Sequence, residues 1–183
     1  MSKIKQLFDL KLLKERQTRA KRIGFAEFLD KAIIRQASER LIQINKKFLK
    51  PAIIGGKADF WAKELYMPEA LLVEDNEFLG LKEKTHDLII HALSLHWYND
   101  PIGQLVQVRK ALVDDGLMLA FLYGGDTLME LRSSFSQAES LTENGISPRV
   151  APMGDLRDLG SLLSRAGLNL NVADINKFEV TYE

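Results

Sequence analysis

Four uninterrupted apolar runs are the feature of this 183-residue chain that most limits its fold. Nearly all of their residues are apolar, without the alternation of apolar and polar residues that marks a sheet with one face in water. Strands buried on both faces have this composition, and they occur in parallel sheets covered by helices. The four runs are Ala52–Ile54, Ala70–Val73, Asp87–Leu93 and Leu117–Leu122.

Helical segments precede and separate these runs. Apolar residues recur at three- and four-residue spacing in residues 3–20 and 24–48, and Pro51 ends that helical region. Further helices are predicted at Lys57–Tyr66, Ile102–Leu112, Asp126–Glu143 and Asp155–Ala166. The alternation of strand and helix predicts an α/β fold with a doubly wound, Rossmann-like parallel sheet and an N-terminal helical extension.

Local signals predict the ends of some of these elements. Asp126 and Asp155 are candidate N-caps, and Gly167 is a candidate C-terminal stop. A turn is predicted at Asp114–Gly116. The final residues, Val172–Ile175 and Phe178–Tyr182, are expected to form a hairpin or an edge strand.

The chain length suits one domain with a sizeable core. We predict a single globular unit, with a basic helical extension over residues 1–50 and an α/β domain over residues 51–183. No apolar run approaches the roughly 18 residues that span a bilayer. No apolar core of secretory type follows the start, so we expect a cytoplasmic protein.

The composition excludes several chemistries. Without cysteine, the chain has no disulfide, thiolate metal site or cysteine nucleophile. No two of the three histidines have metal-ligand spacing, so we predict no metal. A Gly-x-Ser-x-Gly elbow and a Gly-Lys-Ser/Thr phosphate loop are also absent, which argues against hydrolase and P-loop classes.

Charge is distributed unevenly along the chain. Residues 1–50 contain 14 Lys and Arg but 5 Asp and Glu, whereas the remaining residues contain 11 and 20. The excess of basic residues is either a solvated helical face or a contact surface for an acidic partner, an anionic membrane surface or nucleic acid. Aromatic residues are sparse there, so stacking on bases is not supported. We predict no nucleic acid partner and leave peripheral membrane contact open.

Ligands of open parallel sheets bind beyond the carboxyl ends of the strands. Gly55 and Gly56 follow the first run, where glycines let backbone amides approach a ligand. Glu74 lies 18 residues after Gly56, near where an acid would accept hydrogen bonds from a ribose. A glycine pair with a distant acid also suits an ordinary turn, and both interpretations stay open.

The three histidines differ in their expected roles. His91 lies within an apolar run and is expected to be a hydrogen-bonded core residue. His86 lies at a strand entrance and is expected at the surface. His96 follows a strand at the predicted ligand edge, where it is either a general base or an anchor for its loop.

Several stretches carry a family resemblance. They include Phe8–Arg16, Asp75–Leu79, Ser94–Asp100, Ala111–Gly116, Gly124–Leu128, Ser147–Arg149, Asp158–Gly160 and Arg165–Gly167. With them the chain resembles class I S-adenosylmethionine-dependent methyltransferases. More narrowly, it resembles the branch of a mitochondrial respiratory complex I assembly factor associated with arginine hydroxylation, often labelled with the methyltransferase of biotin synthesis.

The resemblance implies a site for S-adenosylmethionine. Its cofactor-binding residues would be Gly55, Gly56, Asp75, Ala92 and Leu93. His96 and Trp97 would lie towards the substrate and are the candidate catalytic residues. Methyl transfer depends chiefly on alignment of the nucleophile with the methyl group, so a dedicated acid or base is optional.

The chain departs from the family pattern at the cofactor site. The family's first strand ends in an acid followed by Gly-x-Gly-x-Gly, but here no acid precedes Gly55 and the third glycine is missing. Only 19 residues separate Gly56 from Asp75, so we expect that one βα unit has been lost and that Asp75 lies near an adenine-contacting position. The family's last strand is also missing. The exposed sheet edges predict a homo-oligomer or a protein partner.

Two functions follow from these observations. One is a methyltransferase with a reduced cofactor pocket and an unknown acceptor. The other is a non-catalytic assembly or interaction protein on a decayed methyltransferase fold, linked to respiratory complex I assembly. Hydroxylation of arginine, associated with the mitochondrial relative, is a third activity of the modification type.

Overall fold

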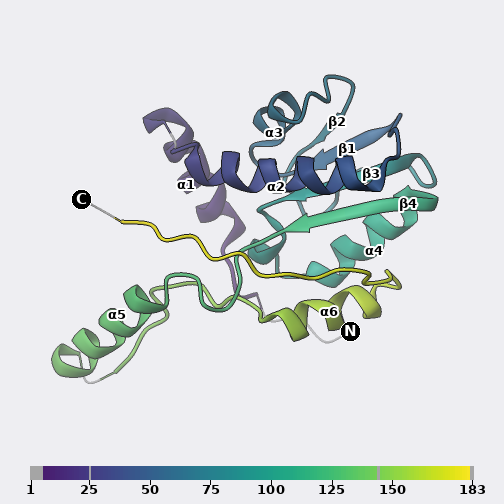
Figure 1. Cartoon of the computed structure of the whole chain (residues 1–183). Coiled ribbons are helices and arrows are strands. Elements are labelled where there is room, and N and C mark those ends of the chain that lie inside the picture. Colours follow the sequence, from purple (N-terminus) through teal and green to yellow (C-terminus); the bar gives the residue numbers. More distant parts are fainter. Residues whose placement is uncertain (1–5, 25, 144, 182–183) are drawn as a thin grey trace.

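A parallel sheet forms the centre of the computed structural model, which describes residues 6–24, 26–143 and 145–181 (Figure 1). Over these residues the sheet has the strand order β2-β1-β3-β4, and every neighbouring pair is parallel. The strands are β1 (Pro51–Ile54), β2 (Leu71–Val73), β3 (His86–Ala92) and β4 (Leu112–Phe121). The predicted α/β fold with a parallel sheet is confirmed.

The strand order agrees with a shortened doubly wound sheet. In the order 3-2-1-4-5-6 two strands lie on one side of the first strand. Here β1 has only β2 on that side among the described residues, with Ala52 directly opposite Leu71. Strands β3 and β4 take the fourth and fifth positions on the other side. The predicted loss of one βα unit accounts for this order.

Helices cover both faces of the sheet. On one face, α2 (Phe28–Ile44) and α3 (Ala58–Glu64) pack against Ile53, Leu88 and Ile90. On the other face, α4 (Pro101–Ala111) packs against the intervening strand residues Ala52, Ile54 and Ile89. Successive side chains of a strand point to opposite faces, so both faces need apolar residues. This requirement explains the continuous apolar runs of the sequence.

Helix α2 contributes buried residues to the core, although it precedes the predicted α/β domain. Ile33, Ile34 and Ala37 of α2 lie in one cluster with Trp61 of α3. The helix ends at Asn45, whose backbone is left-handed, and β1 begins at Pro51. Helix α2 thus shares a core with the sheet that follows it. The domain boundary predicted at residue 51 stays a prediction.

The predicted caps are confirmed for the last helix and wrong for the one before it. Asp155 caps α6 (Leu156–Arg165) by accepting a hydrogen bond from the Asp158 amide at 2.9 Å, and Gly167 stops this helix with a φ of +77°. Helix α5 (Met129–Thr142) begins three residues after Asp126, because residues 124–127 form a turn first. Leu128 is its N-cap and makes no side-chain hydrogen bond.

Two other local predictions differ from the structure. Residues 114–116 are a bulge within β4, since Leu112 pairs with His86 but Leu117 already pairs with Leu88. The hairpin or edge strand predicted near the end is wrong as far as Thr181, where the description ends. Residues 172–175 and 178–181 pair with no described strand and run as exposed coil.

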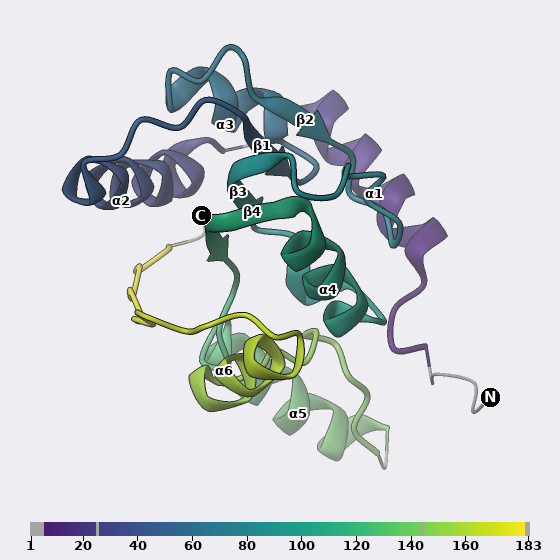
Figure 2. The ribbon, with the colours of Figure 1, turned by 90° about the vertical axis from the view of Figure 1, so that its right-hand side faces the viewer.

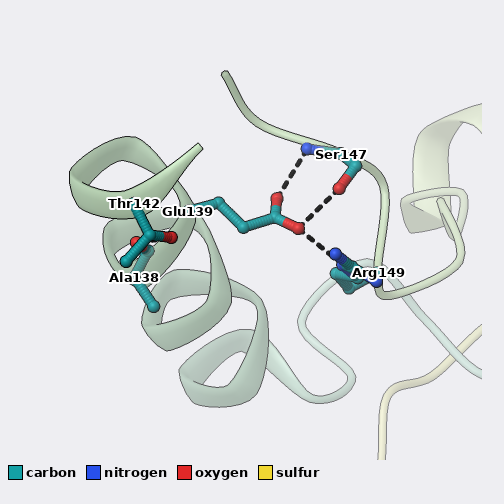
Figure 3. A network of polar contacts seen from close by, with 5 residues as sticks. All are labelled: Ala138, Glu139, Thr142, Ser147 and Arg149. Atoms are coloured by element: carbon teal, nitrogen blue, oxygen red, sulfur yellow. Dashed lines mark hydrogen bonds and ion pairs between the residues drawn. The ribbon is translucent and has the colours of Figure 1, made fainter. Parts of the chain in front are cut away.

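Helix α6 packs against α4, where Leu105 of α4 and Ala166 at the end of α6 share a buried cluster, whereas α5 lies apart from the layers that enclose the sheet (Figure 1 and Figure 2). The loop after α5 is tied to that helix by Glu139, which accepts hydrogen bonds from the Ser147 amide at 2.6 Å and the Arg149 guanidinium at 2.5 Å (Figure 3). These contacts, with one from the Ser147 hydroxyl, lower the pKa of Glu139 to about 2.

None of the described helices is both long and apolar enough to span a bilayer.

Candidate functional site

The five predicted cofactor-binding residues lie at one edge of the sheet. Gly55 and Gly56 follow β1, Asp75 follows β2, and Ala92 ends β3 with Leu93 directly after it. Strand β1 pairs in parallel with both β2 and β3, so the carboxyl ends of all three strands meet there. The parallel sheet thus brings together residues that are about 20 to 40 positions apart in sequence, at the edge where open parallel sheets bind their ligands.

Gly55 is required by the sheet itself. Its φ is +149°, and a Cβ atom there would lie 2.6 Å from the carbonyl oxygen of Ala92. Its amide already donates to the carbonyl oxygen of Val73 at 3.2 Å. The glycine therefore allows two strands to approach closely, and its N–H group is not directed at a ligand.

Gly56 lies beneath a side chain of the N-terminal helix α1 (Leu10–Ile23). A Cβ atom at Gly56 would lie 3.9 Å from the Gln17 carboxamide, the nearest described group. The same carboxamide donates a hydrogen bond of 3.4 Å to Asp75 Oδ2. Gln17 thus lies next to Gly56, and it contacts the predicted adenine-binding acid.

Asp75 is half-buried and only partly hydrogen-bonded. Its Oδ1 atom is buried and has no hydrogen-bond partner among the residues that the structure describes. Burial raises the pKa of this carboxyl, and the side chains of Gln17 and Ser94 oppose that change. An oxygen left in this state is suited to accept a hydrogen bond from a group that binds at the edge.

Helix α1 is held across this edge at its start. The Asn99 side chain accepts hydrogen bonds from the amides of Leu7 and Phe8 at 2.8 and 2.9 Å and donates one of 3.0 Å to the Phe8 carbonyl. The Phe8 ring also packs edge-on against Trp97, with 5.7 Å between the ring centroids. In Figure 1 the arrowheads of the strands point towards α1.

The sequence reasoning missed Gln17 and Asn99. Gln17 follows Leu10 and Leu13 at three- and four-residue spacing, and all three side chains are half-buried on the inner side of α1. That spacing is the only signal that could have singled out Gln17. Asn99 lies within the quoted family stretch at residues 94–100, but its partner is 91 residues away in sequence.

The residue after the glycine pair, Lys57, is fixed by a partly buried ion pair. Lys57 Nζ lies 2.6 Å from Asp30 Oδ2, and the indole N–H of Trp61 donates to Asp30 Oδ1 at 3.2 Å. Asp30 is 3% exposed. The turn after β1 is thereby tied to α2. An acid on the apolar face of a helix was the sequence signal for such a partner, and it was overlooked.

His91 forms a satisfied network beneath the edge. Its Nε2 atom lies 2.9 Å from Gln104 Oε1, and its Nδ1 atom lies 3.1 Å from the Ser94 hydroxyl. Gln104 also donates to the Asn76 carbonyl at 2.6 Å. This arrangement suits a neutral imidazole that donates from Nε2 and accepts at Nδ1. His91 therefore fills the core role expected from the sequence.

His96 has no such network. Both of its ring nitrogens are buried without a hydrogen-bond partner in the described part of the chain. Its ring packs against Trp97 and Tyr123, with centroids 4.8 and 5.0 Å away. Burial, together with the nearby His91, lowers the pKa of His96 to about 4. The imidazole is thus neutral at neutral pH and can both donate and accept a proton.

The two candidate catalytic residues are brought together, but their role stays a prediction. His96 and Trp97 lie in the 3-10 helix η1 (Leu95–Trp97), directly after β3. Trp97 is half-buried between the His96 ring and Phe8. The pair therefore borders the face of the edge that α1 covers.

A wide hollow of about 3280 Å³ lies on the far side of β4. It is bordered by α6 and by the final coil, and Leu93, Trp97 and Tyr123 reach it. Its lining, as far as residues are described, does not include Gly55, Gly56 or Asp75. Small-molecule pockets measure roughly 300 to 1,000 Å³, so this hollow is an uncovered side of the sheet.

His86 corrects one expectation. It is 5% exposed, and its Nδ1 atom lies 3.1 Å from the Lys50 carbonyl oxygen, whereas a surface position was predicted. The strand entrance is covered here because the segment before β1 packs over it.

Among the described residues, no three His, Asp or Glu side chains are grouped so as to hold a metal ion. The absence of a metal stays a prediction.

Known proteins with similar sequences support the resemblance. No protein-family model matches the chain. Human mitochondrial arginine-hydroxylase NDUFAF5 is 42% identical over 121 residues, which are 66% of this chain and 35% of the human protein. A malonyl-(acyl-carrier protein) O-methyltransferase of Laribacter hongkongensis is 33% identical over 114 residues, which are 62% of this chain and 36% of that enzyme. The match thus spans about a third of each relative's length.

A solved structure supports the fold. The plantazolicin methyltransferase BpumL, in complex with a pentazolic desmethylPZN analog and SAH, superposes with a TM-score of 0.54 and 15% identity. The match covers 82% of this chain and 68% of BpumL. Identity at this level bears on the fold alone. With the sequence relatives, it confirms the resemblance to class I methyltransferases and to the branch that contains NDUFAF5.

Proposed function

We propose that this chain is a methyltransferase-fold protein with a degenerate cofactor site, which acts by binding a partner protein. One observation carries the proposal. Gln17 of the chain's own helix α1 lies over Gly56 and is hydrogen-bonded to Asp75. A protein group thus occupies the edge at which an open parallel sheet binds its ligand.

The residues present do not fit tightly bound S-adenosylmethionine while α1 is docked. A cofactor carboxylate would need free backbone amides at the first turn, but the Gly55 amide is bonded to Val73. Lys57, which follows the glycine pair, has its ammonium group paired with Asp30. One Asp75 oxygen accepts from Gln17. Methyl transfer requires a firmly positioned donor, so a site in this state favours a binding role.

The proposed partner is a protein. Strand β4 pairs on one side with β3, and no described strand pairs with its other edge, so this edge is open to a further strand. That edge suits either a homo-oligomer or a different protein. The similarity to NDUFAF5 extends the proposal to the assembly of respiratory complex I, to which the sequence resemblance points.

A second candidate is a methyltransferase that uses S-adenosylmethionine with an acceptor still to be found. Two observations favour it. Asp75 Oδ1 and both nitrogens of His96 are buried without partners among the described residues, which suits a polar ligand at this edge. Several relatives carry methyltransferase names. This function requires α1 to move away from Gly56.

Isothermal titration with S-adenosylmethionine and S-adenosylhomocysteine separates the two functions. The intact chain should bind neither ligand at about 1 mM, because Gln17 fills the edge. The variant Gln17→Ala should bind more tightly than the intact chain, and Thr18→Ala, on the outer side of α1, is the matched control. Micromolar binding by the intact chain that is lost in Gly56→Trp would refute the proposal in favour of the methyltransferase.

A further inference from the structure

We propose that the outer side of helix α1 binds an anionic lipid surface. The helix has 14 residues, and six of them are Lys or Arg against one acid, Glu15. None of its residues is buried. The six basic residues, all exposed, are Lys11, Lys14, Arg16, Arg19, Lys21 and Arg22.

The charges of α1 are uncompensated within the described part of the chain. None of the six cations has a carboxylate within 4.0 Å there. Cations elsewhere are often paired, as Lys31 is with Glu27 and Lys84 with Asp114. A helix whose charges are neutralised by the fold would present little field to a partner. The positive field of α1 is instead directed outwards.

Apolar side chains share the outer side with these cations. Leu12, Arg16, Arg19 and Ile23 follow at spacings of four, three and four residues, which place them on one face. Leu12 is 46% exposed and Ile23 is 74% exposed. This face is opposite Gln17, which points towards the sheet. It offers both charge for lipid phosphates and aliphatic groups for the membrane interior.

The distribution of the cations favours a lipid surface over an acidic protein. A helix turns by about 100° per residue, so the six cations extend around most of its exposed circumference. A discrete set of carboxylates would match a narrow row of cations, whereas a bilayer offers charge over a wide area. Nucleic acid is disfavoured because the ring of Phe8, which precedes the helix, is already packed against Trp97.

The helix is presented in advance of binding. The Asn99 side chain fixes the segment before α1, and Gln17 fixes its inner face. Binding therefore does not require a disordered segment to fold, which would weaken it. The inference is independent of the proposed function, because it uses the outer side of α1 and not the residues at the edge of the sheet.

Flotation of the full chain with vesicles tests the inference. The chain should float with phosphatidylcholine vesicles that contain phosphatidylglycerol and not with pure phosphatidylcholine, and binding should fall as salt rises above about 0.15 M. Each Lys or Arg near an anionic surface changes partitioning roughly fivefold. Arg16→Glu with Arg19→Glu should therefore lower binding by at least about tenfold.

Matched controls keep the result interpretable. Lys82→Glu with Arg157→Glu changes the net charge equally at exposed sites off the helix and should leave binding within about twofold. If circular dichroism shows that the first pair of substitutions disturbs folding, Arg16→Gln with Arg19→Gln is the milder variant to use. Equal binding to neutral vesicles, or equal loss in the control, would overturn the inference. Binding of the chain to polyglutamate without binding to anionic vesicles would also overturn the inference, in favour of an acidic protein.

Discussion

His91 and His96 lie five residues apart at the end of one strand, yet their surroundings differ. Burial lowers the pKa of both to about 4. His91 has hydrogen-bond partners at both ring nitrogens, supplied by Gln104 and Ser94. His96 has none among the described residues. Burial of a histidine is therefore not sufficient to separate a structural residue from a candidate for binding.

The difference divides the edge of the sheet into two parts. The part around His91 is a closed network that ties β3 to α4 and to the loop after β2. The part around His96 keeps unused polar atoms next to aromatic rings and beneath the start of α1. A substitution that breaks a closed network lowers stability, because it leaves the partners without hydrogen bonds. Buried polar atoms without partners already lower stability in the intact chain, and they are suited to bind a ligand.

The largest expected effect is on stability. His91→Leu should lower the free energy of unfolding by about 3 kcal/mol, because it leaves Gln104 and Ser94 buried without their partner. His96→Leu should change it by less than about 1 kcal/mol, since no described hydrogen bond is lost. Urea denaturation of both variants measures the difference. Equal losses would remove the distinction between the two histidines.

The next effect is the dependence of stability on pH. The unfolded chain takes up a proton at each histidine near pH 6.5, but the folded chain does so only near pH 4. Stability is therefore retained above pH 6.5 and lost as the pH falls towards 4. The expected slope is about 1.4 kcal/mol per pH unit for His91 and less for His96, which water partly reaches.

Denaturation at pH 7, 6 and 5 tests this window. Replacement of His91 by Gln should flatten the slope more than replacement of His96 by Gln. Glu139 titrates in a separate window, since its lowered pKa makes its contribution fall only below about pH 4.5. A slope of opposite sign between pH 6.5 and 5 would contradict the burial of both imidazoles.

The smallest effect concerns the attachment of α1. Asn99→Ala removes the hydrogen bonds to residues 7 and 8 and should cost about 1 kcal/mol, because these groups are near the surface. Amides of α1 should then exchange faster, with Asn171→Ala as an exposed control. Release of Phe8 from Trp97 should also raise the pKa of His96 towards 6.5 and leave that of His91 unchanged. An unchanged pKa for His96 in a nuclear magnetic resonance titration would contradict a role for the contact between Phe8 and Trp97 in covering His96.

Much of the fold could be predicted because its signals are local. The apolar runs near residues 52, 71, 88 and 118 all became strands, and those of β1 and β3 are buried on both faces. Asp155 and Gly167 end α6 by contacts within a few residues. The final hairpin failed for the converse reason. Pairing of a strand depends on a free neighbouring edge, which residues 172–181 do not reveal.

The candidate site was predicted in part. Its residues follow from the topology, because parallel strands bring Gly55, Asp75 and Ala92 to one edge. The reason for Gly55 was different from the expected one, since its missing Cβ accommodates the Ala92 carbonyl and not a ligand. Gln17 could not be placed from sequence, because its position depends on how α1 docks through contacts with Asn99 and Trp97.

A nuclear Overhauser measurement between the Gln17 side-chain amide and Gly56 tests the central claim most directly, namely that α1 covers the cofactor edge. The contact should be present in the intact chain and should persist when S-adenosylhomocysteine is added to about 1 mM. Loss of the contact on addition of the ligand, together with a shift of the Gly56 amide, would contradict the claim and identify α1 as a movable cover over a working site.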